Sequence, residues 1–485
     1  MNKALARPIS IVLIVLVITV QNWATCGGGG GGGVGGMGGG SNAQVYQVPW
    51  RVQAPKDPPI TSGLVLYWFP TSQKEIDNSS LRNSRTLSMY ATQCVTMEIA
   101  QVSSDPGQKL AADAKLPVAV LATPDGKPIA KAESNNGFLK VEQVEKLLEN
   151  EIKKRDEALK QKFEAAKEKA KSGDNNAAIP LYRAVLEEKC LFPKRAKDAQ
   201  KELKKLGVND VGAIADPPVF DRAESARIEE VMRRGLKAEN DAKYPEAERL
   251  YSEAHRMDPA DPAPLRYLGE LYRHQTGEWE KARQTFEQIL AMQADPLSRA
   301  VALHGLGKMT IHEGEFKKGL ALMEDSVRTF PIALAYRNLA VYWNSEGDAA
   351  KTDYYVHLAL NLEPNDPFNL VFAAGFMAGT GHGEEALKIA RKHEALLPAS
   401  YNLAAVYAQV GQHEKAIALL KRHFFEYERY QAVRTKEMME ARVDAVFASI
   451  RNDPTFIAIT SGADGKLPMP GNSTMGSRPA GGGGN

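Results

Sequence analysis

Apolar residues recur at helical spacing throughout the C-terminal half of the chain, most clearly over residues 401–420. Leu403, Ala404 and Tyr407 share one side of a predicted helix, and Gly411 marks its end. A second apolar stripe with the same period follows the glycine. The pattern therefore predicts two helices joined by a tight turn, which is a helical hairpin.

The hairpin is repeated upstream with a nearly constant period. Counterparts of Ala404 in the first helix, separated along the chain by 34, 38, 33, 34 and 30 residues, are Gly235, Gly269, Gly307, Ala340 and Ala374. Counterparts of the turn glycine are Gly277, Gly314, Gly347 and Gly381. A recurring unit of this length is typical of solenoids, in which each unit packs against its neighbours. We therefore predict an all-α solenoid of six antiparallel helix hairpins over residues 228–430.

Small residues that face an aromatic residue or Ala across the hairpin make this array resemble the tetratricopeptide repeat family. Gly269, for example, has Phe286 at the spacing at which that family packs its two helices closely. Gly319 and Thr352 depart from the pattern, because the family has Ala at those positions of the second helix. The resemblance implies a concave groove lined by the first helix of each hairpin. It also implies a non-catalytic scaffold that binds protein or peptide partners through that groove.

The groove positions implied by this resemblance are basic and rich in amides. The candidate partner-binding residues are Arg266, Arg273, His274, His304, Lys308, His312, Arg337, Asn338, Asn344, Tyr401 and Asn402. His304, Lys308 and His312 are spaced four residues apart and share one helical face. Arg can bind a carboxylate in bidentate fashion, and Asn can pair with an extended backbone. The hypothesis is therefore an acidic or C-terminal peptide as ligand, and the alternative is a groove of ordinary solvated side chains.

Residues 45–150 show strand-like runs that alternate with short helical segments. Apolar stretches at 64–69, 94–102 and 116–122 predict strands, and 124–126 predicts a turn. Helical segments between them complete the order βαβαββα. The sequence therefore predicts a multidomain protein, with a small α/β domain before the helical array.

The order of elements and one proline make this region resemble the thioredoxin-like family. Pro117 matches the proline that the family holds in the cis form before a strand. The family's paired cysteines would fall at 72–75, where the chain has no thiol. Because thiol exchange requires a thiolate and a resolving thiol, we predict a redox-inactive domain. Ser72 and Glu75 have capping-box spacing, which begins a helix without any chemistry.

The chain has three cysteines, Cys26, Cys94 and Cys190. Cys94 and Cys190 are 96 positions apart and fall in regions that we expect to be different domains. A disulfide between them is possible in an exported protein. We favour two buried thiols, because free cysteine is commonly a small buried apolar residue.

The N-terminus has the pattern of a secretory signal. Lys3 and Arg7 precede an apolar run at 9–20 that is too short to span a bilayer. Cys26 follows, and its setting before a flexible tether resembles a bacterial lipoprotein processing site. Lipidation of Cys26 and ordinary cleavage nearby remain alternatives. We expect an exported protein of the periplasm or cell envelope, with membrane contact only through the signal or the lipid.

The remaining segments are expected to connect, cap or extend these regions. The expected organisation is a signal peptide at 1–26, a Gly-rich tether at 27–44, the thioredoxin-like domain at 45–150, a helical segment similar to the repeats at 151–207, a linker at 208–227, the array at 228–430, capping helices at 431–460 and a disordered tail at 461–485. Val443, Phe447 and Ile450 are predicted to share one side of a closing helix, because the last unit of a solenoid has no neighbour to cover it.

Charge and motifs exclude several classes of function. Since 61 basic and 59 acidic residues leave a formal net charge of +2, no overall field attracts nucleic acid. The sequence contains no phosphate loop, nucleophile elbow or HExxH motif. We predict no enzyme activity, no cofactor and no metal site, since Lys308 between His304 and His312 would repel a cation. The alternatives are an envelope enzyme or redox chaperone acting through residues 45–150, and a structural component; the oligomeric state stays open.

Overall fold

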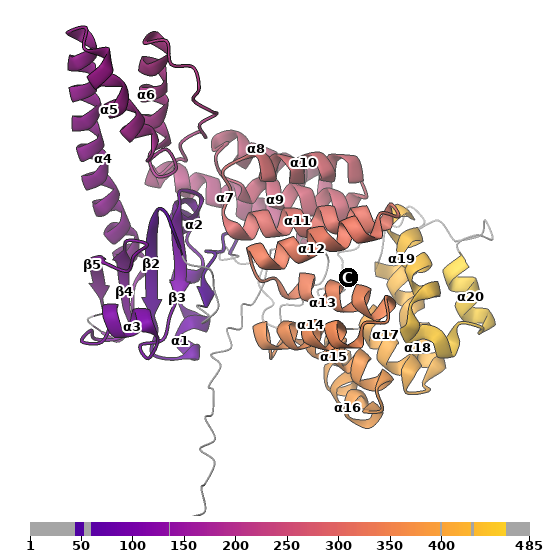
Figure 1. Ribbon diagram of the computed structural model, residues 1–485. Helices are drawn as coiled ribbons and strands as arrows, with labels where there is room; N and C mark the ends of the chain where they lie inside the picture. Colours follow the sequence, from indigo (N-terminus) through magenta and orange to yellow (C-terminus); the bar gives the residue numbers. More distant parts are fainter. Residues whose placement is uncertain (1–43, 53–59, 135, 398–399, 428–430, 462–485) are drawn as a thin grey trace, which may run out of the picture.

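A mixed sheet forms the centre of the N-terminal part of the molecule (Figure 1). The structure, a computed structural model, describes residues 44–52, 60–134, 136–397, 400–427 and 431–461. The predicted signal peptide, Cys26, and all but one residue each of the expected tether and tail lie outside the described residues.

The strands of the sheet are β1 (Arg51–Val52), β2 (Leu64–Phe69), β3 (Val95–Ile99), β4 (Val118–Ala122) and β5 (Pro128–Glu133). Their spatial order is β1-β3-β2-β4-β5, with β1 and β2 parallel to β3 and with β4 antiparallel to both β2 and β5. β2 and β4 are buried along their whole length, because they are central strands with both faces covered, which explains their continuous apolar runs.

The predicted α/β region is confirmed, and its assignment to the thioredoxin-like family stays a prediction. Its helices are α1 (Gln73–Asn78), α2 (Arg85–Thr92) and α3 (Asp105–Leu110). The bond from Leu116 to Pro117 is cis, as the resemblance implies. Ser72 begins α1, and its side chain accepts a hydrogen bond from Glu75 N at 3.3 Å. β1 could not be predicted, because two residues carry no periodicity.

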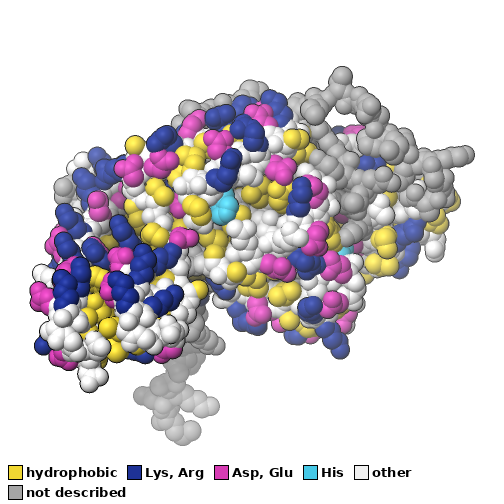
Figure 2. Space-filling model, turned by 90° about the horizontal axis from the view of Figure 1, so that it is seen from above, with side chains coloured by type: hydrophobic (Ala, Val, Ile, Leu, Met, Phe, Trp, Pro, Cys, Tyr) yellow, Lys and Arg dark blue, Asp and Glu magenta, His cyan; other side chains and the backbone are white. Residues whose placement is uncertain are grey.

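A helical arm rises from the sheet (Figure 1). It consists of α4 (Val141–Lys171), α5 (Asn175–Leu186) and α6 (Pro193–Lys205). α4 has 31 residues, so the last helix of the α/β region continues without a break into the next segment. Seen from above, basic and acidic side chains are mixed over the visible face, with Lys and Arg densest over the arm (Figure 2).

Six helical hairpins follow the arm and curve away from it (Figure 1). The paired helices are α7 (Arg222–Asn240) with α8 (Tyr244–Met257), α9 (Ala263–Glu270) with α10 (Trp279–Ala291), α11 (Pro296–His312) with α12 (Phe316–Thr329), α13 (Ala333–Ser345) with α14 (Ala349–Leu362), α15 (Pro367–Gly379) with α16 (Gly383–His393), and α17 (Tyr401–Gln409) with α18 (His413–Arg422). The predicted helical solenoid is confirmed. α7 begins at Arg222, inside the range 208–227 expected to be a linker.

The predicted turn glycines have a left-handed backbone. Gly277, Gly314, Gly347, Gly381 and Gly411 have φ angles of +68°, +94°, +77°, +91° and +81°. A residue with a Cβ atom rarely adopts this conformation, so glycine ends the first helix at low cost.

The small residues of the first helices lie where two helices approach each other closely. A Cβ atom at Gly269 would come within 2.4 Å of the Phe286 ring, which confirms the predicted contact. At Gly319 the reason for the departure from Ala is visible, because a Cβ there would lie 2.5 Å from the backbone oxygen of Gly307. The third hairpin therefore packs glycine against glycine, with its backbones closer than an Ala would permit.

We expect Gly319→Ala to lower the free energy of unfolding by about 1–3 kcal/mol, because its Cβ would overlap backbone atoms that cannot move aside. Glycine-to-alanine changes inside helices otherwise stabilise by about 0.5–1 kcal/mol. Gly375→Ala in α15 is the matched control, since a Cβ there meets nothing within 4 Å. Urea unfolding of both variants checks the pair, and stabilisation by Gly319→Ala would contradict the close packing.

The array is closed by α19 (Gln431–Val443), a 3-10 helix (Ala445–Ile450) and α20 (Pro454–Ser461). Phe447 and Ile450 are buried as predicted. The prediction for Val443 is wrong, because this side chain is 78% exposed. α19 ends at Val443, and Asp444 begins a new helical turn by accepting from Val446 N at 3.1 Å. The change of direction separates Val443 from the closing face.

A buried ion cluster joins the sheet region to the array. Arg85 of α2 is 1% exposed. Its guanidinium donates to Asp261 Oδ2 at 3.1 Å, forms an ion pair with Asp258, and donates to Ser225 Oγ at 2.6 Å. Tyr46, which precedes β1, donates to the same Asp261 oxygen at 2.7 Å. Both carboxylates belong to the turn between α8 and α9. The guanidinium of Arg85 therefore links the sheet region to the array.

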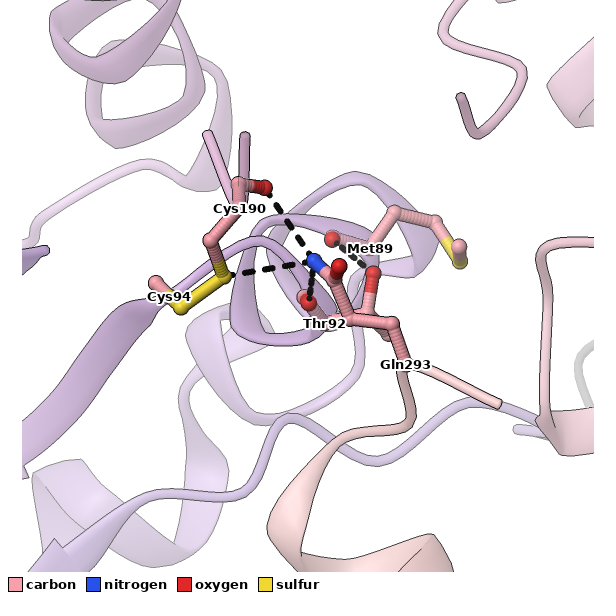
Figure 3. Close-up of a disulfide and its surroundings, with 5 residues drawn as sticks. All are labelled: Met89, Thr92, Cys94, Cys190 and Gln293. Carbon is pink, nitrogen blue, oxygen red and sulfur yellow. Dashed lines mark hydrogen bonds between the residues drawn. A yellow bond between two sulfur atoms is a disulfide. The ribbon is translucent and has the colours of Figure 1, made fainter. Parts of the chain in front are cut away.

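The prediction of two buried thiols is wrong, because Cys94 and Cys190 form a disulfide (Figure 3). Cys94 lies immediately before β3 with a φ of +56°, and Cys190 lies between α5 and α6. Gln293, from the stretch between α10 and α11, donates from Nε2 to Cys190 O at 3.1 Å and to Thr92 O at 2.6 Å. Sheet, arm and array therefore meet at this point, a proximity that sequence separation does not reveal.

Candidate functional site

The candidate partner-binding residues all lie on the first helices of hairpins, as the resemblance implies. They belong to α9 (Arg266), the π-helix Leu271–Thr276 that continues it (Arg273 and His274), α11 (His304, Lys308 and His312), α13 (Arg337, Asn338 and Asn344) and α17 (Tyr401 and Asn402). We call this set of residues the inner surface. π-Helical turns are rare and occur frequently at functional sites.

Most of the inner surface is shielded from solvent. Its residues with no more than 9% exposure are Arg266, Arg273, His274, His304, Lys308, Asn338 and Tyr401. Its half-buried residues are His312, Arg337, Asn344 and Asn402. Since burial of a polar group without a partner is unfavourable, the partners of these groups define what the surface can bind.

Arg273 has a carboxylate partner one turn away. Glu270 is fully buried and accepts from Arg273 Nη2 at 2.6 Å and from Nε at 3.3 Å. A bidentate pair of this kind offsets the cost of burying both charges. The guanidinium of Arg273 is therefore engaged within the fold.

His304 and Asn338 join α11 to α13. His304 Nε2 lies 2.8 Å from Asn338 Nδ2, so the ring nitrogen accepts from the amide. Burial lowers the pKa of His304 well below its ordinary value, and the nearby charges of Arg273 and Lys308 lower it further. The imidazole is therefore neutral at physiological pH, and its Nδ1 finds no hydrogen-bond partner among the described residues.

Two carboxylates of α19 face the inner surface. Glu440 Oε1 lies 2.8 Å from His312 Nε2. Glu437 Oε2 lies 3.1 Å from Nε2 of His423, which follows α18. Burial lowers the pKa of Lys308, and the charges of Glu440 and Glu437 oppose this shift. The most basic part of the inner surface therefore already binds acidic groups of the same chain.

Arg337 is held by the fifth hairpin. Its Nη1 donates to Asn369 Oδ1 at 2.6 Å and lies 3.8 Å from Asp366 Oδ1. Asn369 also donates to Glu363 Oε2 at 3.2 Å. Burial, together with the charge of Asp366, raises the pKa of Glu363 to about 8. Glu363 is therefore mostly protonated at neutral pH, and Arg337 has Asp366 as its charged neighbour.

Tyr401 completes this network at the sixth hairpin. Its hydroxyl donates to Asp444 Oδ2 at 3.1 Å, and its ring packs edge-on against His423 with centroids 5.9 Å apart. Asn344 and Asn402 make no side-chain hydrogen bond to any described residue, and both stay half-exposed. The structure therefore unites Lys308, His312 and Tyr401 around α19 and leaves the two amides outside this cluster.

Arg266 differs from the other cations of the inner surface. It is 3% exposed, its Nε has no hydrogen-bond partner, and no described carboxylate forms an ion pair with it. Its guanidinium carbon lies 5.8 Å from the centroid of the Tyr267 ring, an attractive contact for a cation. Among the described residues, Arg266 is thus a buried guanidinium without a carboxylate partner.

The extended segment at 44–50 also contacts the array. Tyr267 of α9 donates from its hydroxyl to Val45 O at 3.2 Å. Val45 and Tyr46 are each 4% exposed and pack into the same core as α7 to α11. A first helix therefore already binds a backbone carbonyl from the segment that precedes β1.

Sequence reasoning missed the groups that cover the inner surface. Glu437 and Glu440 stood in a segment expected only to cap the array. Glu437 and Glu440 share one helical face, since they are three residues apart. That spacing was a usable signal, but nothing local indicates which helix they approach.

The described ranges contain no candidate for a metal site or a membrane span. Within the described ranges, no group of three or more His, Cys, Asp or Glu side chains could hold a metal ion. Among the helices of those ranges, none is long and apolar enough to cross a membrane.

We expect the purified protein not to reduce disulfides. The loop before α1 begins a helix through Ser72, and Cys94 and Cys190 are bonded to each other from separate elements. Thiol exchange needs an accessible thiolate with a resolving thiol beside it. An insulin-reduction assay checks this, and activity above background that is lost in Cys94→Ser would show the prediction to be wrong.

The comparison with protein families supports the helical repeats. The family model described as Tetratricopeptide repeat matches residues 241–306. A curated Arabidopsis thaliana protein named Protein CTR9 homolog is 24% identical over 232 residues, which are 38% of this chain and 21% of that protein. The chain thus spans about a fifth of that relative's length. A crystal structure of a tetratricopeptide repeat protein from Thermus thermophilus aligns with a TM-score of 0.31 at 20% identity, covering 38% of this chain and 99% of that one.

Proposed function

Because this chain is a tetratricopeptide repeat protein, we propose that it is a non-catalytic scaffold that binds an acidic protein or peptide on its inner surface. Solenoid repeats use extended surfaces of this kind to bind partners. The inner surface supports an acidic ligand, since its His312 already pairs with a carboxylate of the same chain.

Arg266 is the observation that carries this proposal. Its guanidinium is buried, and no described carboxylate pairs with it. A buried charge without a partner destabilises a fold, whereas a carboxylate supplied by a ligand would offset that cost. Arg266 is therefore a group that a partner can use and the fold does not need.

The test begins with chemical crosslinking of the full chain in cells, which identifies a bound protein. Affinity is then measured with that purified partner for wild type and Arg266→Met. We expect the variant to bind at least about tenfold more weakly, because a charge-assisted contact is lost. Binding by the variant should also depend less on salt. Its melting temperature should be unchanged or raised.

Arg249→Met is the matched control, because Arg249 is an exposed arginine on α8 that pairs with Glu253 at 3.1 Å. We expect this control to bind like wild type. Equal affinity of Arg266→Met and wild type would overturn the proposed use of the inner surface.

We further propose that the α/β region is a thioredoxin-like domain without redox activity. The strand order of its sheet supports this assignment. Its contacts through Arg85 and Cys94 support a structural role, since both residues join the domain to other parts of the molecule.

Export, with anchoring through Cys26, is part of the same proposal. The apolar run at 9–20 supports export, and the disulfide supports it too, because disulfides persist in oxidising compartments. Fractionation of cells should find a processed chain outside the cytoplasm. Cys26→Ser should release the protein from membranes if a lipid holds it there. An uncleaved chain in the cytoplasm would contradict export.

A further inference from the structure

α19 contacts a hairpin well before the last one, which a capping helix does not need to do. A cap protects the last repeat, because that repeat lacks a neighbour. Met438 and Ala441 of α19 do this, since both are buried in the core of the last hairpins. Glu440 instead pairs with His312 at 2.8 Å, and His312 belongs to the third hairpin.

Glu440 is surrounded by first helices. Its charge opposes the lowering of the pKa of Lys308 in α11. In α13, burial raises the pKa of Tyr342 and the charge of Glu440 adds to the rise. In α17, burial and Asp444 raise the pKa of Tyr401, and Glu440 again adds. The carboxylate of Glu440 thus affects the pKa of side chains on the first helices α11, α13 and α17. α19 therefore lies across the inner surface.

Glu437 extends the same contact by one turn. Its carboxylate is 3.1 Å from His423 and, like that of Glu440, it lowers the cost of the buried charge on Lys308. The side chains of Glu437 and Glu440 are 6% and 31% exposed. In contrast, Met439 and Val443 on another side of α19 are 61% and 78% exposed. The acidic side of the helix is therefore the docked side.

We propose that α19 is an internal ligand of the inner surface, and that the partner displacing it is a helical segment with two carboxylates one turn apart. This inference rests on the proposed function and names the chemistry of the ligand. The partner would place its carboxylates near His312 and Lys308, where Glu440 and Glu437 lie in the free protein. α19 would thereby restrict binding to segments that compete with it.

The experiment uses a fluorescent peptide of residues 431–444 and the full chain. In the test variant, Glu437→Gln and Glu440→Gln remove both carboxylates of α19. We expect this variant to bind the peptide at least about tenfold more tightly than wild type, because the internal competitor is weakened. A peptide with both glutamates replaced by Gln should not bind. Adding Lys308→Met to the test variant should return binding to the wild-type level.

Glu384→Gln with Glu385→Gln on α16 is the matched control, since both side chains are exposed in the first turn of that helix. We expect this control to bind the peptide like wild type. Equal binding by test variant and wild type, or equal binding of both peptides, would overturn the proposal.

A second measurement does not depend on the folding of a variant. In wild type, a saturating concentration of the peptide should increase amide hydrogen exchange of residues 431–443, because α19 is displaced. Unchanged exchange in the presence of bound peptide would overturn the internal-ligand role. If the crosslinked partner still required Arg266 in that case, the proposed function would stand and only the role of α19 would fall.

Discussion

Replacing Arg85 by Met should lower the free energy of unfolding by about 3–5 kcal/mol, because it leaves buried carboxylates without their cation. Asp258 and Asp261 are each 1% exposed, and their side chains meet the guanidinium from one side. Methionine can fill the space of the aliphatic part of the arginine side chain. The loss of unfolding free energy therefore measures the effect of the missing charge. Urea unfolding followed by tryptophan fluorescence measures it.

The loss of unfolding free energy in Arg85→Met should decrease as the pH falls. Burial already raises the pKa of Asp261, and Arg85 opposes that rise. Without Arg85 the folded-state pKa of Asp261 rises further above its unfolded value. The destabilisation by Arg85→Met is therefore complete above the folded-state pKa of Asp261. It disappears below the unfolded-state pKa of this carboxyl, which is about 4. A pH-independent loss would contradict this assignment.

Arg183→Met provides the matched control for Arg85. Arg183 pairs with Asp210 at 2.9 Å, but the two side chains are 50% and 63% exposed. Water and salt screen an exposed ion pair, so Arg183→Met should lose far less stability than Arg85→Met. A loss in Arg183→Met as large as in Arg85→Met would show that burial is not the cause.

The helical hairpins could be predicted from the sequence because their signals are local. Gly277 and Gly411 end helices through their own backbone conformation, and Gly269 and Phe286 lie within one hairpin. The strands of the α/β region could be predicted for the same reason, except for the two-residue β1. Elements and their neighbours along the chain follow from periodicity and turn chemistry.

The contacts between distant segments could not be predicted. Arg85 and Asp261 are 176 positions apart, and an arginine in a short helix gives no sign of a buried partner. The residues of the inner surface lie on first helices of hairpins, but their burial was not foreseen. Glu440 covers His312 because the curved array brings α19 near α11, and that curvature is not a local property.

Removing the disulfide should produce the other large effect. Cys94 and Cys190 are separated by 96 positions, and linking them restricts the unfolded chain. We expect the double variant Cys94→Ser, Cys190→Ser to lose about 2–4 kcal/mol of unfolding free energy. Urea unfolding with and without dithiothreitol measures it. Reductant should lower the stability of wild type to that of the double variant.

The same reductant should leave the double variant unchanged, which separates loss of this bond from other effects of the reagent. Gln293 gives a further test, because its amide donates to Cys190 O and Thr92 O on the two sides of the bond. Without the disulfide, Gln293→Ala should destabilise more than it does in wild type, because the hydrogen bonds of the amide then hold Thr92 and Cys190 without the covalent bond beside them. If Gln293→Ala lowers the stability equally with and without the disulfide, the hydrogen bonds of Gln293 and the disulfide stabilise this junction independently.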